Sequence, residues 1–495
     1  MVRVRAPELP LSYTWLNTDK PLSIKQLKGR IVILDFWTYC CINCLHVLPD
    51  LKYLEQKYKD SLTVIGVHSA KFDNEKDIEN IRQAILRYDI EHPVLVDKDF
   101  RVWQEYAVRA YPSFMLIDPE GYIVASFMGE GKRDILDELI QQIIQQHQDK
   151  GTINLRELDV ILEKQRQPII TPLAFPGKVL ATPSSLFIAD TAHNRIVVTT
   201  LEGELLHVIG SGKSGLSSGD FNTAEFSAPQ GMTFNNQNQI LYVADTENHA
   251  LRKVDLRRQY VETIAGTGIQ NRNLSFTQGN GLDITLNSPW DLVKHENQLY
   301  IAMAGTHQIW MMDLETNIIR TYAGTGAEAC FDGELNTSVF AQPSGITINS
   351  NFLYTADSES SSIRAINLET GKVTTICGSG DLYSFGDKDG IGEEVRLQHC
   401  MGVEYAQGNL WVADTYNHKI KLVNPRTGEC KTVLGNGASD INFSEPSGLS
   451  ILNSNLYIAD TNNHAIEQVH LDTLKVTTLK ISGLCAPDFC VPASN

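Results

Sequence analysis

Residues 37–44 read Trp-Thr-Tyr-Cys-Cys-Ile-Asn-Cys, and the first third of the chain is organised around them. The apolar run at residues 31–34 comes just before this segment and is typical of a buried strand. Residues 45–54 follow it with apolar side chains three and four positions apart, a spacing that predicts a helix. Cys41 is therefore expected at the point where a strand passes into a helix.

Two cysteines of this segment have the spacing of a thiol–disulfide exchange pair. The first N–H groups of a helix have no partner within the helix, and the helix dipole is positive there. Because both effects favour a thiolate, Cys41 is expected to titrate below the ~8.5 of a free cysteine. Cys44 lies about one helical turn later, where it can attack a mixed disulfide formed at Cys41. The sequence thus predicts that Cys41 reacts faster than Cys44.

Residues 35–44 resemble the active-site segment of thioredoxin-like proteins. The resemblance implies that Cys41 is the attacking cysteine and Cys44 the resolving cysteine. It also implies that Asp35 is the buried aspartate that handles the proton. The match extends over roughly residues 8–148 and includes the entry segment of the redoxin branch of the family at residues 21–30.

Two prolines also match this family. Pro49 corresponds to the proline that kinks the active-site helix, and residues 109–114 resemble the loop that carries the cis-proline. The resemblance implies that Pro112 has a cis peptide bond, faces the cysteines and aligns the substrate backbone. The predicted catalytic set is therefore Cys41, Cys44, Asp35 and Pro112.

The pattern after residue 44 predicts an α/β sheet with helices on both faces. The expected elements are a strand at 62–68, a helix at 77–86, a strand at 93–97, a hairpin at 114–118 and 122–126, and a helix at 134–148. Residues 149–168 are polar and charged, and we interpret them as a connector. The first domain is therefore expected at residues 1–148.

An internal repeat occupies the chain from residue 169 onward. A Leu-aromatic-x-Ala-Asp-like segment recurs six times at intervals of 46 to 58 residues; its copies begin at Leu186, Leu241, Leu299, Leu353, Leu410 and Leu456. About four short strands per repeat are typical of propeller blades. We therefore predict a six-bladed all-β propeller at residues 169–483 and a tail at 484–495.

The repeats resemble NHL repeats, which are named for an Asn-His-Leu-like segment carried best at residues 248–251, 417–420 and 463–466. Met303 replaces the aspartate in the third repeat, and serines 360–362 replace the Asn-His pair in the fourth, so these two turns are expected to be less regular. A thioredoxin-like module joined to NHL repeats is similar to the NHL repeat-containing protein 2 family. Animal members carry a further C-terminal β-domain, whose role is not carried over to this chain.

The recurring aspartates at Asp190, Asp245, Asp357, Asp414 and Asp460 could suggest a metal site or a lyase. Because they recur at one repeat position, we interpret them as turn residues that bind backbone N–H groups. No metal and no cofactor is expected.

Several cysteine assignments have alternatives. Cys41 and Cys44 could be a structural or metal-binding pair, but the first domain has no second Cys/His pair at zinc-ligand spacing. Cys40 stands where the family usually has tryptophan, and we interpret it as a packing residue, with a third redox thiol as the alternative. Cys485 and Cys490 are expected to be free thiols, with a tail disulfide as the alternative.

Composition excludes several classes of function. The net charge of −17 makes nucleic acid a poor partner. The N-terminus has no secretory signal and no apolar run approaches a membrane span, so a cytoplasmic protein without membrane contact is expected. Nine cysteines in 495 residues favour a redox pair over a disulfide scaffold.

Three functions stay open from the sequence. The first is a protein-thiol/disulfide oxidoreductase that acts on protein disulfides, with a protein partner docked on the propeller. The second is a non-enzymatic binding scaffold with a vestigial redox module. The third is a peroxidase, which is disfavoured because Leu34 stands where peroxiredoxins have proline.

Overall fold

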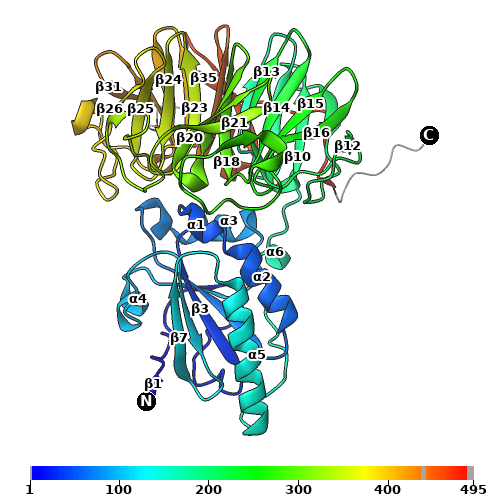
Figure 1. Cartoon of the computed structure of the whole chain (residues 1–495), viewed down its shortest axis with the longest axis vertical. Coiled ribbons are helices and arrows are strands. Elements are labelled where there is room, and N and C mark those ends of the chain that lie inside the picture. The colour runs from blue at the N-terminus through cyan, green and yellow to red at the C-terminus, as the bar shows by residue number, and fades with distance from the viewer. Residues whose placement is uncertain (1–2, 436, 438–441, 488–495) are drawn as a thin grey trace. The chain divides into compact units, whose positions relative to one another are not determined.

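The structure is a computed structural model that describes residues 3–435, 437 and 442–487. The chain divides into two compact units, Met1–Ile169 and Ile170–Asn495. Figure 1 draws the first unit in blue to cyan and the second in green to red. Within the described ranges, every helix is too short or too polar to cross a membrane.

Unit 1 is built on one seven-stranded sheet with the order β1-β7-β6-β3-β4-β5-β2. Strands β3, β4 and β5 are parallel, whereas β6 and β7 run antiparallel to their neighbours. The strands are β1 (Val4–Arg5), β2 (Trp15–Leu16), β3 (Ile31–Trp37), β4 (Leu62–His68), β5 (Val94–Val96), β6 (Ser113–Ile117) and β7 (Tyr122–Met128). The helices are α1 (Ile42–Leu45), α2 (Leu48–Lys57), α3 (Ile78–Arg87), α4 (Arg101–Glu105), α5 (Arg133–Asp149) and α6 (Glu163–Arg166).

Strand β3 is the centre of this sheet and is buried along its whole length. Because successive side chains point to opposite faces, Ile33 packs with Leu54 of α2 and Ile140 of α5 on one face. Leu34 packs with Val102 of α4 on the other. Figure 1 shows α2 and α5 beside the sheet. The predicted thioredoxin-like α/β fold is confirmed.

The helix expected at residues 45–54 is two helices. The first, α1, ends at Leu45, and α2 begins at Leu48 with Pro49 in its first turn. A proline is tolerated there because the first turn has no internal acceptor for its missing N–H. Pro49 therefore lies at the start of α2 rather than at a kink inside one helix.

Residues 149–168, expected as a connector, pack on unit 1, which continues past residue 148 to Ile169. The backbone N–H of Asn154 donates to the carbonyl of Gly29 at 2.7 Å. Glu163 is buried and accepts from the Arg82 guanidinium at 2.9 Å. These contacts join residues that are far apart in sequence, so the polar composition of the segment did not reveal them.

Unit 2 is the predicted six-bladed propeller, and each blade is an antiparallel sheet of consecutive strands. The four main strands of the blades are β8 (Val179–Ala181), β9 (Leu186–Asp190), β10 (Arg195–Thr199) and β11 (Leu205–Ile209); β13 (Pro229–Asn235), β14 (Ile240–Asp245), β15 (Ala250–Asp255) and β16 (Tyr260–Ala265); β18 (Pro289–His295), β19 (Gln298–Met303), β20 (Gln308–Asp313) and β21 (Ile318–Ala323); β23 (Pro343–Asn349), β24 (Phe352–Asp357), β25 (Ser362–Asn367) and β26 (Lys372–Cys377); β28 (Gly402–Ala406), β29 (Asn409–Asp414), β30 (Lys419–Val423) and β31 (Glu429–Leu434); β32 (Pro446–Leu452), β33 (Asn455–Asp460), β34 (Ala465–His470) and β35 (Lys475–Thr478). Blades two to five add a short outer strand, β12 (Gly219–Asp220), β17 (Gln278–Asn280), β22 (Gly333–Glu334) and β27 (Gly390–Ile391). The repeated sequence segment is the second main strand of every blade.

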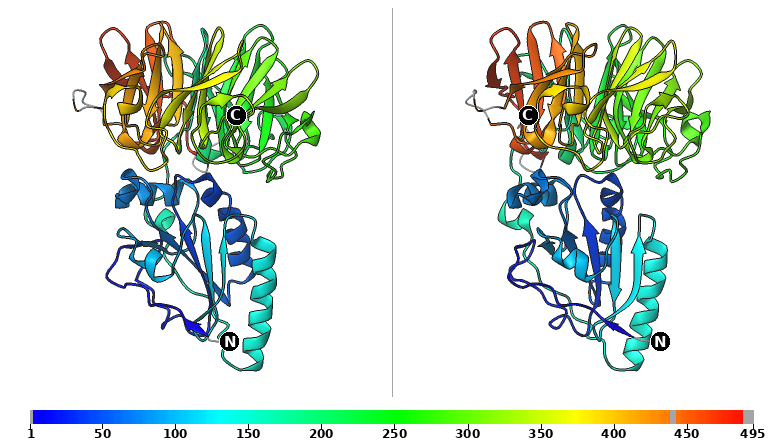
Figure 2. Two further views of the ribbon diagram at one scale, coloured as in Figure 1. Left: turned by 60° about the vertical axis from the view of Figure 1, so that its left-hand side comes forward. Right: turned by 90° about the vertical axis from the view of Figure 1, so that its left-hand side faces the viewer.

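The inner strands of the blades lie side by side in a closed ring. Each inner strand neighbours that of the next blade, and β32 of the last blade neighbours β8 of the first. Figure 2 shows the blades as a row of twisted sheets. The ring closes between two complete blades, through bonds such as the Ser447 hydroxyl to the Gly177 carbonyl at 2.7 Å.

One side chain links each blade to the next. It follows the second strand in a left-handed backbone conformation with φ between 48° and 55°, and its acceptor atom binds a backbone N–H of the following blade at 2.9–3.1 Å; the six residues are Asn194, His249, His307, Ser361, His418 and His464. The expectation that the turns of blades three and four are less regular is wrong. His307 and the Ser361 hydroxyl accept the same bond that histidine accepts elsewhere.

The five recurring aspartates end the second strand of their blades and are fully buried. In each, Oδ1 accepts a backbone N–H at 2.6–2.8 Å; the donors are Ala174, Ser227, Ala341, Gln398 and Ser444. In three blades a cation seven residues later faces Oδ2, namely Arg252, Arg364 and Lys421, and in the first blade Arg195, five residues later, takes this place at 2.7 Å. The predicted role in turn hydrogen bonding is confirmed.

Two blades depart from this charge pair. Blade three replaces both partners with apolar residues, Met303 and Trp310, which are buried together in one core. Blade six keeps Asp460 but has Glu467 at the position of the cation. Burial and the nearby Glu467 charge raise the pKa of Asp460 to about 7, although bonds from Asn463 and Ser444 oppose the shift.

A different ion pair, between Lys178 and Asp291, joins the inner parts of the blades. Lys178 comes directly before the first inner strand, at a position that is glycine in four other blades and Asp291 in the third. Its ammonium group contacts Asp291 at 3.1 Å and the carbonyls of Ser344 and Met401 at 2.9 and 2.7 Å. The two side chains that replace glycine therefore neutralise each other and join four blades.

Candidate active site

Cys41 is the N-cap residue of α1, as its predicted place between strand and helix required. Its backbone is extended, with φ −81° and ψ 114°, and its carbonyl accepts the N–H groups of Cys44 and Leu45 at 3.0 and 3.2 Å. Cys41 is half-buried, whereas Cys44 has no exposed surface. A substrate can therefore reach the first sulfur and not the second.

The environment of Cys44 favours the thiol form over the thiolate. Burial raises its pKa well above the usual value, and the adjacent Cys41 thiol and the charge of Asp35 raise it further. Because a thiol is a poor nucleophile, Cys44 needs a base to take its proton.

Asp35 lies on β3, fully buried, where its charge influences Cys44. Neither carboxylate oxygen has a hydrogen-bond partner among the described residues. Burial raises the pKa of Asp35 to about 7; the charge of Glu55 adds to this shift and that of His92 opposes it. Asp35 therefore changes protonation near neutral pH, which suits a group that exchanges a proton with Cys44.

Glu75 supports the turn before the active cysteines and was not identified from the sequence. It is fully buried in a short 3₁₀ helix, and its Oε1 accepts from the Thr38 hydroxyl at 2.6 Å and the Cys40 N–H at 2.9 Å. Its Oε2 accepts the N–H groups of Lys71 and Phe72 at 2.9 Å. Glu75 occurs in a charged stretch that is typical of a surface loop, so nothing local indicated this role.

Cys40 is buried, with its sulfur 3.6 Å from the Thr38 hydroxyl oxygen. Its backbone N–H is held by Glu75. This environment fits the interpretation of Cys40 as a packing residue.

The loop before β6 contains the expected cis-proline. The Tyr111–Pro112 peptide bond is cis. The Tyr111 hydroxyl donates to the Ser69 carbonyl at 2.6 Å. Burial raises the pKa of Tyr111, and Glu75 and the three cysteines of the segment add to the shift, which places this loop near the thiols. That Pro112 itself faces the cysteines stays a prediction.

Elsewhere in unit 1, Asp118, Glu120 and His147 come close enough together to hold a metal ion. The Arg3 guanidinium already donates to both carboxylates, at 2.6 and 3.1 Å. The Arg3 side chain thus already supplies a positive charge to the two carboxylates of this cluster.

Cys485 forms a disulfide, so the expectation of a free thiol there is wrong. Its carbonyl accepts from Arg195 at 3.0 Å. Cys490 lies outside the described residues.

Comparisons with known proteins match both units. The thioredoxin-like family profile matches residues 29–123. The chain is 45% identical over 472 residues to Protein SUPPRESSOR OF QUENCHING 1, chloroplastic, of Arabidopsis thaliana, covering 90% of this chain and 44% of that protein. It is 42% identical over 489 residues to NHL repeat-containing protein 2 of Bos taurus, covering 90% of this chain and 67% of that protein. Over 124 residues the chain is also 31% identical to the thiol-disulfide oxidoreductase ResA of Bacillus cereus, covering 25% of this chain and 69% of that protein.

The chain spans less than half of the plant relative and about two thirds of the bovine one. The similarity nevertheless runs through the thioredoxin-like unit and the propeller together. The resemblance drawn from the two motif sets is confirmed, and the chain belongs to the NHL repeat-containing protein 2 family.

Proposed function

We propose that the protein is a thiol–disulfide oxidoreductase whose substrates are protein disulfides. The observation that supports this most strongly is the combination of a half-buried Cys41 at a helix N-terminus, a fully buried Cys44 and a buried Asp35 that has no hydrogen-bond partner within the described part of the chain. A relative of the thioredoxin-like unit is named as a thiol-disulfide oxidoreductase, which agrees with this assignment.

In the proposed reaction the Cys41 thiolate attacks one sulfur of the substrate disulfide. A bond forms between Cys41 and that sulfur, the substrate S–S bond breaks, and the first substrate thiolate leaves. Asp35 then takes the proton of Cys44, and the Cys44 thiolate attacks Cys41. The second substrate thiolate leaves, so the substrate gains two electrons and the Cys41–Cys44 pair becomes a disulfide.

Pro112 would align the substrate backbone beside Cys41, and the propeller would bind the rest of the substrate protein. Two weak contacts on one chain can raise the combined affinity by roughly 10²–10⁴ when both form together. We further propose that the protein works in the cytoplasm, since the chain has few cysteines. Because the plant relative is named as chloroplastic, imaging of the tagged chain in its own cells is the test of location.

Insulin reduction by the full chain, with dithiothreitol as electron donor, tests the chemistry. Activity lost in both Cys41→Ser and Cys44→Ser is the expected result. If the wild-type chain reduces insulin no faster than the two variants, the binding-scaffold function is favoured instead. Rapid consumption of hydrogen peroxide by the wild-type chain would favour a peroxidase.

Trapping tests the docking role of the propeller. Cys44→Ser cannot resolve the mixed disulfide, so it retains substrates on Cys41, and Cys41→Ser is the blank. We expect a short reproducible set of proteins for the full chain and a broad faint set for residues 1–169, the whole of unit 1. Identical sets would remove the docking role.

A further inference from the structure

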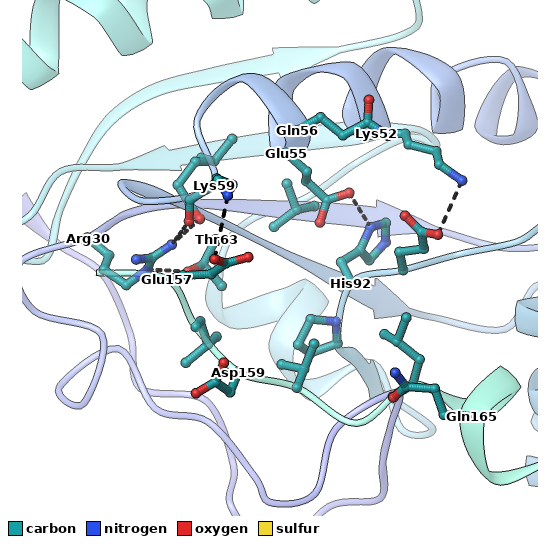
Figure 3. A pocket seen from close by; sticks show the side chains of 17 residues that line it. Arg30, Lys52, Glu55, Gln56, Lys59, Thr63, His92, Glu157, Asp159 and Gln165 are labelled. Atoms are coloured by element: carbon teal, nitrogen blue, oxygen red, sulfur yellow. Dashed lines mark hydrogen bonds and ion pairs between the residues drawn. The ribbon is translucent and has the colours of Figure 1, made fainter. Parts of the chain in front are cut away.

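Unit 1 has a cavity of about 390 Å³ bounded by α2, β4, the loop before β5 and residues 157–165. Figure 3 shows Glu55 of α2 and His92 pointing toward each other in this cavity. Their closest atoms, Oε2 and Nδ1, are 3.3 Å apart. The cavity therefore brings a carboxylate and an imidazole into contact at a solvent-accessible site.

The inner edge of the His92 ring lies next to the position of Asp35. Gly66 on β4 pairs in register with Asp35 on β3, so both residues face the same side of the sheet. A Cβ atom at Gly66 would lie 3.2 Å from His92 Nε2 and 2.8 Å from the indole nitrogen of Trp37. The imidazole thus fills the space that glycine leaves beside the buried aspartate.

Asp35 and His92 share an unusual state for buried polar groups. Both are almost fully buried, at 0% and 3% exposure, and neither the Asp35 oxygens nor His92 Nε2 has a hydrogen-bond partner among the described residues. A buried polar group without a partner is costly to keep. Two such groups side by side, one an acid and one a base, point to an exchange of protons rather than to stabilisation.

We propose that His92 and Glu55 relay a proton between Asp35 and the solvent of this cavity, and act as positioning residues for the resolving step at Cys44. This inference rests on the proposed function. It assigns to the cavity a role that neither the cysteine segment nor the cis-proline loop reveals.

The electrostatics agree with the geometry. Burial lowers the pKa of His92, but Glu55, Asp35 and Glu91 outweigh it and the net shift is upward. In return, the charge of His92 lowers the pKa of Asp35. Each group thus responds to the protonation of the other.

The other charged groups around the relay are held elsewhere. On α2, Lys52 pairs with Asp89 at 2.6 Å and with Glu91 at 3.4 Å. Arg30 donates to backbone carbonyls and to the Thr63 hydroxyl. Glu157 and Asp159 also line the cavity. His68 on β4 is neutral because burial lowers its pKa to about 3.

The proton balance of the relay is simple. Asp35 accepts the Cys44 proton before the Cys44 thiolate attacks Cys41. Because no hydrogen bond joins Asp35 and His92 directly among the described residues, a bridging water carries the proton on to His92 Nε2. His92 releases its Nδ1 proton to Glu55, which exchanges it with water in the cavity. Asp35 then returns to the carboxylate form, and no further oxidant or reductant enters these steps.

Single-turnover kinetics of the full chain test this relay. Reaction of the reduced protein with a chromogenic aromatic disulfide forms a mixed disulfide at Cys41, and the second release of coloured thiolate reports the attack by Cys44. In His92→Gly we expect this release to slow about five- to tenfold at pH 7 and its pH midpoint to rise by about one unit, because Asp35 loses a neighbouring positive charge. Added imidazole should restore the rate in His92→Gly and not in Asp35→Asn.

Glu55→Gln, at the rim of the cavity, should also slow the release at pH 7, whereas Asp159→Asn removes a carboxylate from the same cavity and should not. Alkylation of Cys41 should be equal in all variants. If Glu55→Gln and His92→Gly leave the pH profile unchanged while Asp35→Asn alters it, the relay is wrong and the proposed function stands. If the wild-type chain shows no Cys44-dependent release, both are wrong.

Discussion

Asp35 in unit 1 and Asp414 in unit 2 are both fully buried carboxylates, yet their surroundings are opposite. Asp414 accepts from the Gln398 N–H and the Asn417 amide at 2.7 Å and faces Lys421 at 3.4 Å. Asp35 has no hydrogen-bond partner among the described residues. Burial raises both pKa values, to about 6 and about 7, so the pKa alone does not separate them. The hydrogen bonds do: a satisfied carboxylate holds a fold, and an unsatisfied one is available to exchange protons.

The largest effect is expected from Asp414→Ala. Removing the Asp414 carboxylate leaves the Gln398 N–H and the Asn417 amide without their acceptor, at about 1–3 kcal/mol for each buried group. Lys421 keeps Asp387 at 2.9 Å and Asp389 at 3.2 Å, so its charge stays paired. Thermal or urea unfolding of the variant measures this loss, and alkylation of Cys41 should be unchanged. Full stability combined with loss of an activity of the whole chain would instead indicate an active site in the propeller.

Asp35→Asn should change the stability in the opposite direction and make the protein more stable at high pH. A carboxyl group whose pKa is raised from 3.8 to about 7 contributes stability below its ordinary pKa, and this contribution is lost as the pH rises through about 7. Since one pKa unit corresponds to about 1.4 kcal/mol, the variant should be about 2–4 kcal/mol more stable than the wild type at pH 9, with little difference at pH 4. Urea unfolding at both pH values measures this, and an equal effect at both would contradict the assignment.

The two active-site thiols should also differ in their reactivity, because one is partly exposed to a reagent and the other is fully buried. At pH 7 Cys41 should be alkylated at least about tenfold faster than Cys44, because Cys44 is buried and its pKa is raised. Mass spectrometry of the timed reaction separates the two sites. Equal rates, or a faster Cys44, would reverse the proposed roles.

The smallest effect is expected in blade six. Glu467→Arg would place beside Asp460 a cation such as four other blades have, and lower the pKa of Asp460 from about 7. Stability above pH 7 should rise by about 1 kcal/mol, less than a full pair contributes because Glu467 also accepts from Thr478 at 2.9 Å. Glu467→Gln is the matched control, and a gain as large in this neutral variant would show that the missing cation is not the cause.

The parts of the fold that were predictable from sequence are those with local or periodic signals. The order of strand, Cys41 and helix follows from neighbouring residues, and the six copies of the second strand follow from a repeat. The turns at His307 and Ser361 were expected to be less regular, but both have the left-handed conformation of the other blades. The fold of the blade sets this conformation, and an Asn-His pair is not needed for it.

The parts of the site that were missed are held by residues distant in sequence. Glu75 reaches the Thr38–Cys40 turn from a short 3₁₀ helix in a charged stretch, and His92 fills the space beside Gly66, the residue paired with Asp35. Neither residue belongs to a motif, so no local spacing could indicate it.

By itself, the sequence determined the two fold types, the cysteine pair and the repeat of structural aspartates, because each is encoded in residues close together or regularly spaced. Only the tertiary structure decided which buried carboxylates are satisfied, that Asp35 has no hydrogen-bond partner in the described ranges, and that Glu55 and His92 meet in a cavity on its side of the sheet. Hydrogen bonding and burial depend on which strands and helices meet in space. That physical difference is why chemistry could be suspected from the motif but its proton pathway could be inferred only from the fold.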